Sequence, residues 1–244
     1  DDKAGIKGSV EFLVYVDGHG KTFNQVLERG FELTGRFGIN MVLFDWPTDY
    51  LALRKTVHNA DEVAANFVFA MNRLSKWLGY NYPSASVSAI FHSMGNRILK
   101  SVTNKHLLEH MPKDLFSNLI LNAAAVKQEN HRKWVEKLTI QKRIYVTINQ
   151  NDRTLQGAKI LRFAHQLGLG NKNKTAGNAK YVDLTQVALK EHNLFLGKTE
   201  SEKSNPLIYR FYDQAFHGEE VDFQNETAYQ ILSPSEISFR FSVR

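Results

Sequence analysis

The sequence contains no cysteine, only 5 prolines and no apolar run of membrane-spanning length. Without cysteine, the chain excludes disulfide scaffolds, cysteine nucleophiles, cysteine-ligated zinc and iron–sulfur clusters. Its 15 glycines and 5 prolines are too few for a collagen-like or proline-rich protein, and a membrane-spanning helix would need ~18 consecutive apolar residues. With 43% hydrophobic and 23% charged residues over 244 positions, the chain has the composition of a folded globular protein.

Positive charge exceeds negative charge by a modest amount. Lys and Arg number 31 against 25 Asp and Glu, which gives a net charge of +6. The basic residues are spread out, with local clusters only at Arg132–Lys133, Lys142–Arg143 and Lys172–Lys174. Because no aromatic residues are interleaved with these clusters, we expect no nucleic-acid partner. We also expect no integral membrane segment and a soluble protein, either cytoplasmic or exported after N-terminal processing.

Short apolar runs alternate along the chain with longer segments of helical periodicity. We expect strands over 11–16, 39–44, 86–92, 119–126, 143–148 and 180–184, and helices over 24–36, 61–78, 94–109, 129–138, 154–167 and 206–216. Regular alternation of this kind predicts a three-layer α/β/α sandwich with a mostly parallel sheet of about six strands. We expect one domain over residues 1–244, with a core at about 11–217 and a C-terminal appendage at 218–244.

A candidate nucleophile lies where the third predicted strand meets a helix. Residues 86–92 run into Ser93 and the following helix with almost no connecting loop. Such a turn strains the backbone of one residue and lifts its side chain above the sheet edge, as in the nucleophile elbow Gly-x-Ser-x-Gly. The downstream glycine is Gly95, whereas Phe91 departs from the motif at the upstream position. We therefore predict Ser93 as the nucleophile.

Two later residues complete the chain order serine, acid, histidine that this architecture requires. Asp152 follows the strand at 143–148, and His192 follows the sixth predicted strand. Serine is a weak nucleophile unless an imidazole accepts its proton and a carboxylate holds that imidazole in the correct tautomer. We predict His192 as general base and acid and Asp152 as the residue that orients it. Asp183 is the next candidate for the acid.

Each of these residues also has an ordinary structural explanation when it is taken alone. Ser93 could cap the following helix, Asp152 could be a turn residue, and His192 is one of nine histidines. Their order and their positions after the predicted strands favour the catalytic interpretation.

Catalysis at Ser93 would also need two backbone N–H groups directed at the oxyanion of the tetrahedral intermediate. We expect one from Met94, which follows the serine, and one from the loop after the first strand, at Gly18 and His19. Glycine there lets the backbone approach the substrate closely.

The same loop reads Gly20-Lys21-Thr22, which is the end of a phosphate-binding P-loop. The full motif requires an earlier glycine, and that position is Tyr15, inside the predicted strand. A nucleotide-hydrolysing function is therefore disfavoured.

The motifs resemble those of the α/β-hydrolase superfamily, in particular a bacterial group of uncharacterised serine esterase or lipase-like hydrolases. The resemblance covers roughly residues 11–197. It rests on these segments: Asp17-Gly18-His19-Gly20-Lys21-Thr22-Phe23, Phe44-Asp45-Trp46-Pro47-Thr48, His92-Ser93-Met94-Gly95-Asn96, Asn151-Asp152-Arg153 and His192-Asn193-Leu194-Phe195. In the group the first loop begins with histidine, where this chain has Asp17. The resemblance implies a serine hydrolase that acts on esters. The chain leaves no room for a large lid after the fourth strand, so we expect an open substrate cleft walled by Trp46, Tyr50, Met94 and residues after Val126.

The sequence therefore predicts a reduced α/β-hydrolase fold, without a large lid, that cleaves carboxylic esters through an acyl-enzyme. Thioester hydrolysis or acyl transfer on the same residues remains an alternative, as does a binding protein with an inert triad. We expect a small-molecule or lipid-like ester as partner, no cofactor and no metal site. His106 and His110 have the spacing of metal ligands on a helix but lack the glutamate of a metalloprotease helix.

Overall fold

The computed structural model describes residues 10–48, 52–162, 164–171, 174–196, 206–225, 228–232 and 238–241. Within these ranges, no helix is both long enough and apolar enough to cross a membrane. The strands are β1 (Glu11–Val16), β2 (Asn40–Phe44), β3 (Ser86–His92), β4 (Phe116–Asn122), β5 (Gln141–Ile148), β6 (Lys180–Asp183), β7 (Tyr229–Ile231) and β8 (Ser238–Phe241). The α-helices are α1 (Phe23–Phe37), α2 (Leu53–Glu62), α3 (Ala64–Asn81), α4 (Asn96–Asn104), α5 (Arg132–Val135), α6 (Arg153–Arg162), α7 (Thr185–Ala188) and α9 (Pro206–Phe216). Short 3₁₀ turns are η1 (Ser93–Gly95), η2 (Leu107–His110), η3 (Leu167–Leu169) and η4 (Leu194–Leu196).

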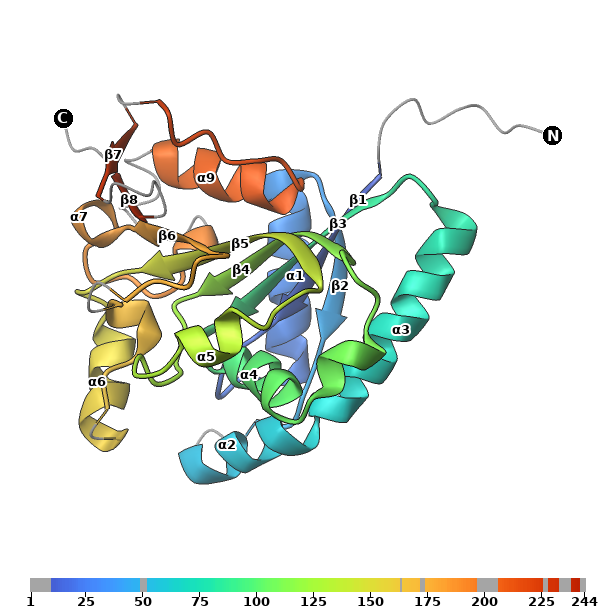
Figure 1. Ribbon diagram of the computed structural model, residues 1–244, viewed down its shortest axis with the longest axis horizontal. Helices are drawn as coiled ribbons and strands as arrows, with labels where there is room; N and C mark the ends of the chain where they lie inside the picture. The colour runs from blue at the N-terminus through green and yellow to red at the C-terminus, as the bar shows by residue number, and fades with distance from the viewer. Residues whose placement is uncertain are drawn as a thin grey trace.

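All the strands join one sheet in the order β2-β1-β3-β4-β5-β6-β8-β7. Every neighbouring pair is parallel except β7 and β8, which are antiparallel. The helices lie on both faces of the sheet, with α1 behind it and α3, α4 and α5 in front in Figure 1. Because the sheet is mostly parallel, the carboxyl ends of β1 to β6 meet at one edge, where ligand chemistry in this fold class is found.

Alternate residues of the strands enter two separate apolar cores. Val14, Val16 and Phe91 face the core beneath α3 and α4, while Leu13 and Tyr15 face the core beneath α1 and α9. Burial on both faces explains why these strands read as continuous apolar runs.

The predicted α/β sandwich with a mostly parallel sheet is confirmed, but the sheet has eight strands rather than about six. The two additional strands, β7 and β8, come from the segment 218–244 that we expected as an appendage. They are short, and β8 reaches the sheet only by pairing with β6 across a large sequence separation. No local pattern reports such a pairing.

Some predicted elements have other limits. The strand expected over 119–126 ends at Asn122, because Ala123 has a left-handed backbone with φ of 44°. The helix expected over 61–78 corresponds mainly to α3, and it is preceded by a separate helix, α2, from which it is divided at Val63. The connection between β4 and β5 contains the short helix α5.

Candidate active site

The backbone turns sharply at Ser93, where β3 ends. Ser93 has φ of 51°, in the left-handed region that is strained for a residue with a side chain, and it begins the turn η1 that leads into α4. The Asn96 side-chain amide donates to the carbonyl of Phe91 at 2.6 Å and to that of Ser93 at 3.1 Å. These hydrogen bonds hold the two limbs of the turn together.

Two glycines make the turn possible because the backbone of another strand passes against it. A Cβ on Gly95 would lie 2.7 Å from the carbonyl oxygens of both Val16 and Asp17. A Cβ on Gly18 would lie 2.8 Å from the Ser93 Cβ. Phe91 replaces the motif's upstream glycine without disturbing the turn, because its ring is buried in the core against Phe67 at 5.3 Å.

His192 and Asp152 meet at the same edge of the sheet. His192 Nδ1 lies 2.6 Å from Asp152 Oδ2, and the side chains are 12% and 1% exposed. The other carboxylate oxygen of Asp152 accepts the backbone N–H of Leu155 at 2.9 Å, at the start of α6. Because the buried carboxylate accepts, Nδ1 is the donor, which leaves Nε2 of neutral His192 as a proton acceptor.

A second histidine packs on the first. The ring centroids of His92 and His192 are 4.6 Å apart, and the His92 side chain is buried. Asn122 Oδ1 accepts hydroxyls from Tyr212 at 2.6 Å and Thr147 at 3.1 Å, so its amide nitrogen is the donor to His92 Nδ1 at 3.0 Å. His92 therefore carries its proton on Nε2. Burial, followed by the nearby His192, lowers the pKa of His92 well below its usual value.

Ser93 and His192 are brought to the same region but are not joined. Ser93 is 7% exposed and directly follows His92, whose ring touches His192. No hydrogen bond links the Ser93 hydroxyl to His192 in the described part of the chain. Such contacts are often loose before substrate binds.

The first loop is held by a buried ion pair. Asp17 accepts from Arg29 Nη1 at 2.7 and 2.8 Å, and the same guanidinium nitrogen donates to the Tyr15 hydroxyl at 2.9 Å. Asp17 Oδ1 also accepts the Gly18 backbone N–H at 2.6 Å. The Asp17 carboxylate is thus neutralised within the loop, and the Gly18 N–H is engaged there.

The other predicted substrate-binding residues surround this loop. Trp46 is buried and its indole N–H donates to the Asp17 carbonyl at 3.0 Å, so it supports the loop from below. His19 Nδ1 contacts the Thr56 hydroxyl on α2 at 2.9 Å. Met94 is buried directly after Ser93. Tyr50, expected in the cleft wall, lies outside the described residues.

Two alternative candidates from the sequence, Asp183 as the acid and the Gly-Lys-Thr segment as a phosphate loop, make structural contacts instead. Asp183 binds Arg240 at 2.9 Å and caps the turn at Thr185, so its carboxylate is used away from His192. Thr22 of the Gly-Lys-Thr segment is the N-cap of α1 and forms a capping box with Gln25. Among the residues described, no three His, Asp or Glu side chains are grouped as metal ligands would be.

Sequence reasoning did not single out Arg29 or Asn122. Arg29 had a detectable signal, because it is a charged residue between Val26 and Leu33 on the apolar face of α1. Asn122 is a polar residue at the end of an apolar strand, and its partners come from β3, β5 and α9. Only the folded chain brings these elements together.

A doubly covered, mostly parallel sheet with a strained serine turn after a central strand defines the α/β-hydrolase class. Residues 6–211 match the family model described as "Alpha/beta hydrolase of unknown function (DUF900)", so the chain belongs to that family. No curated protein sequence matches the chain.

Three solved structures show partial similarity. An uncharacterized protein from Bacillus cereus ATCC 10987 is 12% identical to this chain, with a TM-score of 0.47. The match covers 86% of this chain and 60% of the Bacillus protein, so this chain spans less than two thirds of that protein's length. A zinc-bound cold-adapted esterase from an Arctic intertidal metagenomic library is 17% identical with a TM-score of 0.44, over 86% and 84%. A putative hydrolase from Agrobacterium vitis S4 is 10% identical with a TM-score of 0.44, over 82% and 87%.

The substitution Gly95→Ala is expected to lower the free energy of unfolding by about 1–3 kcal/mol, because the added methyl group meets two backbone oxygens that cannot rotate away. Urea unfolding measures the loss. The control is Gly79→Ala on α3, where no atom lies within 4 Å of the new Cβ and about 0.5–1 kcal/mol of stabilisation is expected. Equal effects of the two substitutions would contradict the close approach at Gly95.

Removing Arg29 should destabilise the protein more than removing the whole ion pair. Arg29→Met leaves the Asp17 carboxylate buried without its cation and is expected to cost about 3–5 kcal/mol in unfolding free energy. The double variant Arg29→Met/Asp17→Asn should recover part of that loss. If the double variant is as unstable as Arg29→Met, the two side chains are not coupled.

Stability should fall with pH below about 6.5, where free histidine binds a proton. Burial lowers the pKa of His92 and His131, so the folded state excludes protons that the unfolded state binds. His92 should contribute a slope of roughly 1 kcal/mol per pH unit as the pH falls from 6.5 to 5.5, and His131 should add to it in the same direction. Urea unfolding at several pH values measures it, and His92→Gln should flatten the slope. An unchanged slope in that variant would show that His92 is protonated in the folded protein.

Proposed function

We propose that this protein is a serine hydrolase that cleaves carboxylic esters, with Ser93 as nucleophile, His192 as base and acid, and Asp152 as the orienting carboxylate. The observation that carries the proposal is the buried 2.6 Å contact between His192 and Asp152, at the sheet edge where Ser93 occupies a strained turn. A histidine with a buried carboxylate on Nδ1, next to a serine in left-handed geometry, is the arrangement that activates a hydroxyl.

In the proposed reaction, His192 Nε2 accepts the Ser93 hydroxyl proton as Oγ attacks the ester carbonyl. The charge that forms on the substrate oxygen is bound by the backbone N–H groups of Met94 and His19. The intermediate collapses, and the leaving alcohol takes the proton from His192, leaving an acyl group on Ser93. Water then attacks the acyl-enzyme by the same proton transfers and releases the acid.

Asp152 and His92 support this imidazole in different ways. Asp152 stabilises the positive charge that His192 acquires in each step. His92 stays neutral, because burial lowers its pKa, so it packs on His192 without opposing that charge. Gly18 contributes by leaving room beside Ser93.

A fluorophosphonate probe should label the parent protein and leave Ser93→Ala unlabelled, because the probe bonds only to an activated serine. Ser75→Ala, at a half-buried serine on α3, serves as the matched control and should label like the parent. Labelling is measured by intact mass.

Asp152→Asn should lower kcat/KM for a short-chain ester by ~10³–10⁴ with little change in KM, since the tautomer of His192 is no longer held. The surface pair of His217 and Asp213 offers a control, and Asp213→Asn should keep parental activity. Labelling of Ser93→Ala, or full activity of Asp152→Asn, would overturn the proposal.

A further inference from the structure

A groove of about 900 Å³ lies between the region of α5 and the residues Ala164, His165, Asn171 and Lys174. It is almost entirely polar, and Ala164 is the one apolar residue among those that line it in the described chain. It adjoins a second cavity of about 620 Å³ that shares Gln128, His165 and Asn171 and continues past the carboxyl ends of β5, β6 and β8.

The rim of the groove carries more positive than negative charge. Lys127, Lys133 and Lys174 line it, are exposed, and form no ion pair with any residue the structure describes. Arg132 is bound by Glu136 at 3.0 Å, which leaves Glu129 as the acidic residue facing the lysines. Lysine ammonium groups bind phosphate as point charges.

The wall of the groove contains a glutamine side chain. Gln128 is 6% exposed and lines both cavities, and within the described chain its side chain makes no hydrogen bond. Its amide is therefore available to a ligand bound in the groove. Its N–H groups are donors of the kind that bind an oxyanion.

Lys127, which lines the groove, lies close along the chain to a residue that contacts the nucleophile turn. The backbone N–H of Ala125 donates to the Ser93 carbonyl at 3.1 Å, and Lys127 follows two residues later. Two residues of extended chain span about 7 Å at most. The Lys127 Cα therefore lies within about 7 Å of the Cα of Ala125, which contacts the nucleophile turn, so Lys127 is the groove lysine that a substrate at Ser93 would meet first.

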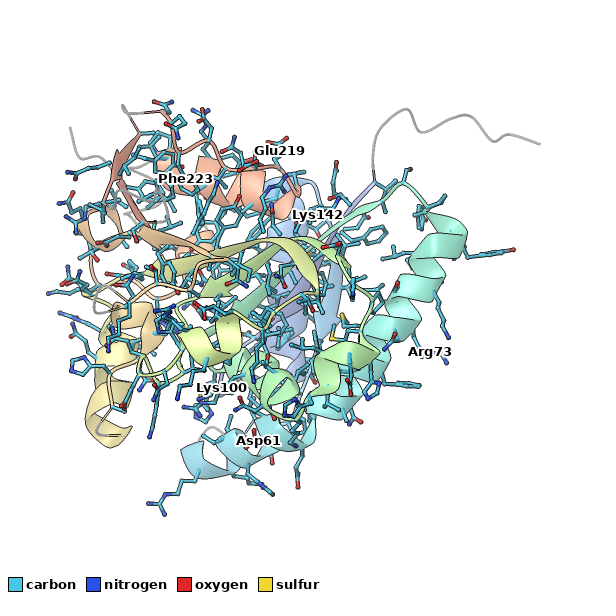
Figure 2. The ribbon with its side chains drawn as sticks, in the orientation of Figure 1. Asp61, Arg73, Lys100, Lys142, Glu219 and Phe223 are labelled. Atoms are coloured by element: carbon cyan, nitrogen blue, oxygen red, sulfur yellow. The ribbon has the colours of Figure 1, made fainter. Side chains whose placement is uncertain are left out.

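Positive charge also accumulates between the groove and α4. Burial lowers the pKa of Lys100, and the nearby Arg97 and Lys127 lower it further, while Asp61 acts in the opposite direction. Figure 2 shows Lys100 and Asp61 in the lower part of the view. Lys127 of the groove therefore lies in an environment that also contains the cations Lys100 and Arg97.

We propose that this groove binds a phosphate group carried by the substrate of Ser93, so that the preferred substrates are phosphorylated esters. The assignment of the phosphate to a substrate rests on the proposed esterase function, whereas phosphate binding does not. Lys127, Lys133 and Lys174 supply the charge, and the Gln128 amide supplies an uncharged hydrogen-bond donor.

The binding test uses inorganic pyrophosphate, titrated calorimetrically into the full-length Ser93→Ala protein. Binding should weaken at least tenfold when Lys127, Lys133 and Lys174 are all changed to Gln. Gln128→Leu, which removes the amide and no charge, should also weaken it. High salt should diminish the effect of the three lysine substitutions, because it screens their charge, and should leave the effect of Gln128→Leu unchanged.

The matched control changes Lys76, Lys113 and Lys142 to Gln. These lysines are exposed and lie outside the groove, and their substitution removes the same net charge. This variant should bind pyrophosphate within twofold of its parent. No binding at millimolar pyrophosphate, or equal weakening in the two triple variants, would overturn the proposal.

The kinetic test compares two esters that differ only in the phosphate, monoacetylglycerol 3-phosphate and monoacetylglycerol, in the active enzyme. We expect kcat/KM at least tenfold higher for the phosphorylated ester, and loss of that preference in the groove triple variant. Equal kcat/KM for both esters would overturn the assignment to the substrate. Pyrophosphate binding without labelling at Ser93 would remove the esterase proposal and leave the phosphate site.

A second pair of substrates distinguishes whether the phosphate belongs to a free metabolite or to a lipid headgroup. A soluble phosphorylated ester favoured over the same acyl chain on phosphatidylglycerol vesicles indicates a free metabolite. The reverse preference, lost in the groove triple variant, indicates a lipid headgroup. Both results support the groove, and a preference that survives in that variant contradicts it.

Discussion

The site depends on one constraint, which is the close passage of the end of β1 against the turn after β3. The backbone of Val16 and Asp17 lies so near Gly95 that no side chain fits there. This contact brings the first loop to Ser93, and the hydrogen bonds of Asn96 hold the strained serine in place. The cost of a left-handed serine is sustained because the surrounding strands determine the path of the chain on both sides.

The first loop shows how a buried charge is neutralised inside the fold. Asp17 brings a negative charge to the loop beside Ser93, and an unpaired negative charge there would oppose an oxyanion. Arg29 reaches from α1 to neutralise it, and the Tyr15 hydroxyl accepts from the same guanidinium. The neutralising cation comes from a neighbouring helix, so the charge balance of the loop depends on how α1 packs against the sheet.

Much of the fold followed from the sequence because it is recorded in local patterns. Strand β3 was predicted with its observed limits, since seven residues of apolar strand end abruptly at a helix. The predicted end of β4 was wrong because the chain leaves the strand at Ala123, whose left-handed backbone is one that alanine rarely adopts. Strands β7 and β8 were missed because they are short and depend on the edge of β6.

The sequence by itself determined the alternation of strands and helices, the family, and the chain positions of Ser93, Asp152 and His192. Those properties rest on periodicity and motif spacing, which are local. Tertiary structure alone decided that His192 contacts Asp152 rather than Asp183, that His92 packs on it through Asn122, and that Arg29 serves Asp17. These contacts join residues far apart in the chain, and their distances depend on how the sheet edge and helices pack, which no local segment encodes.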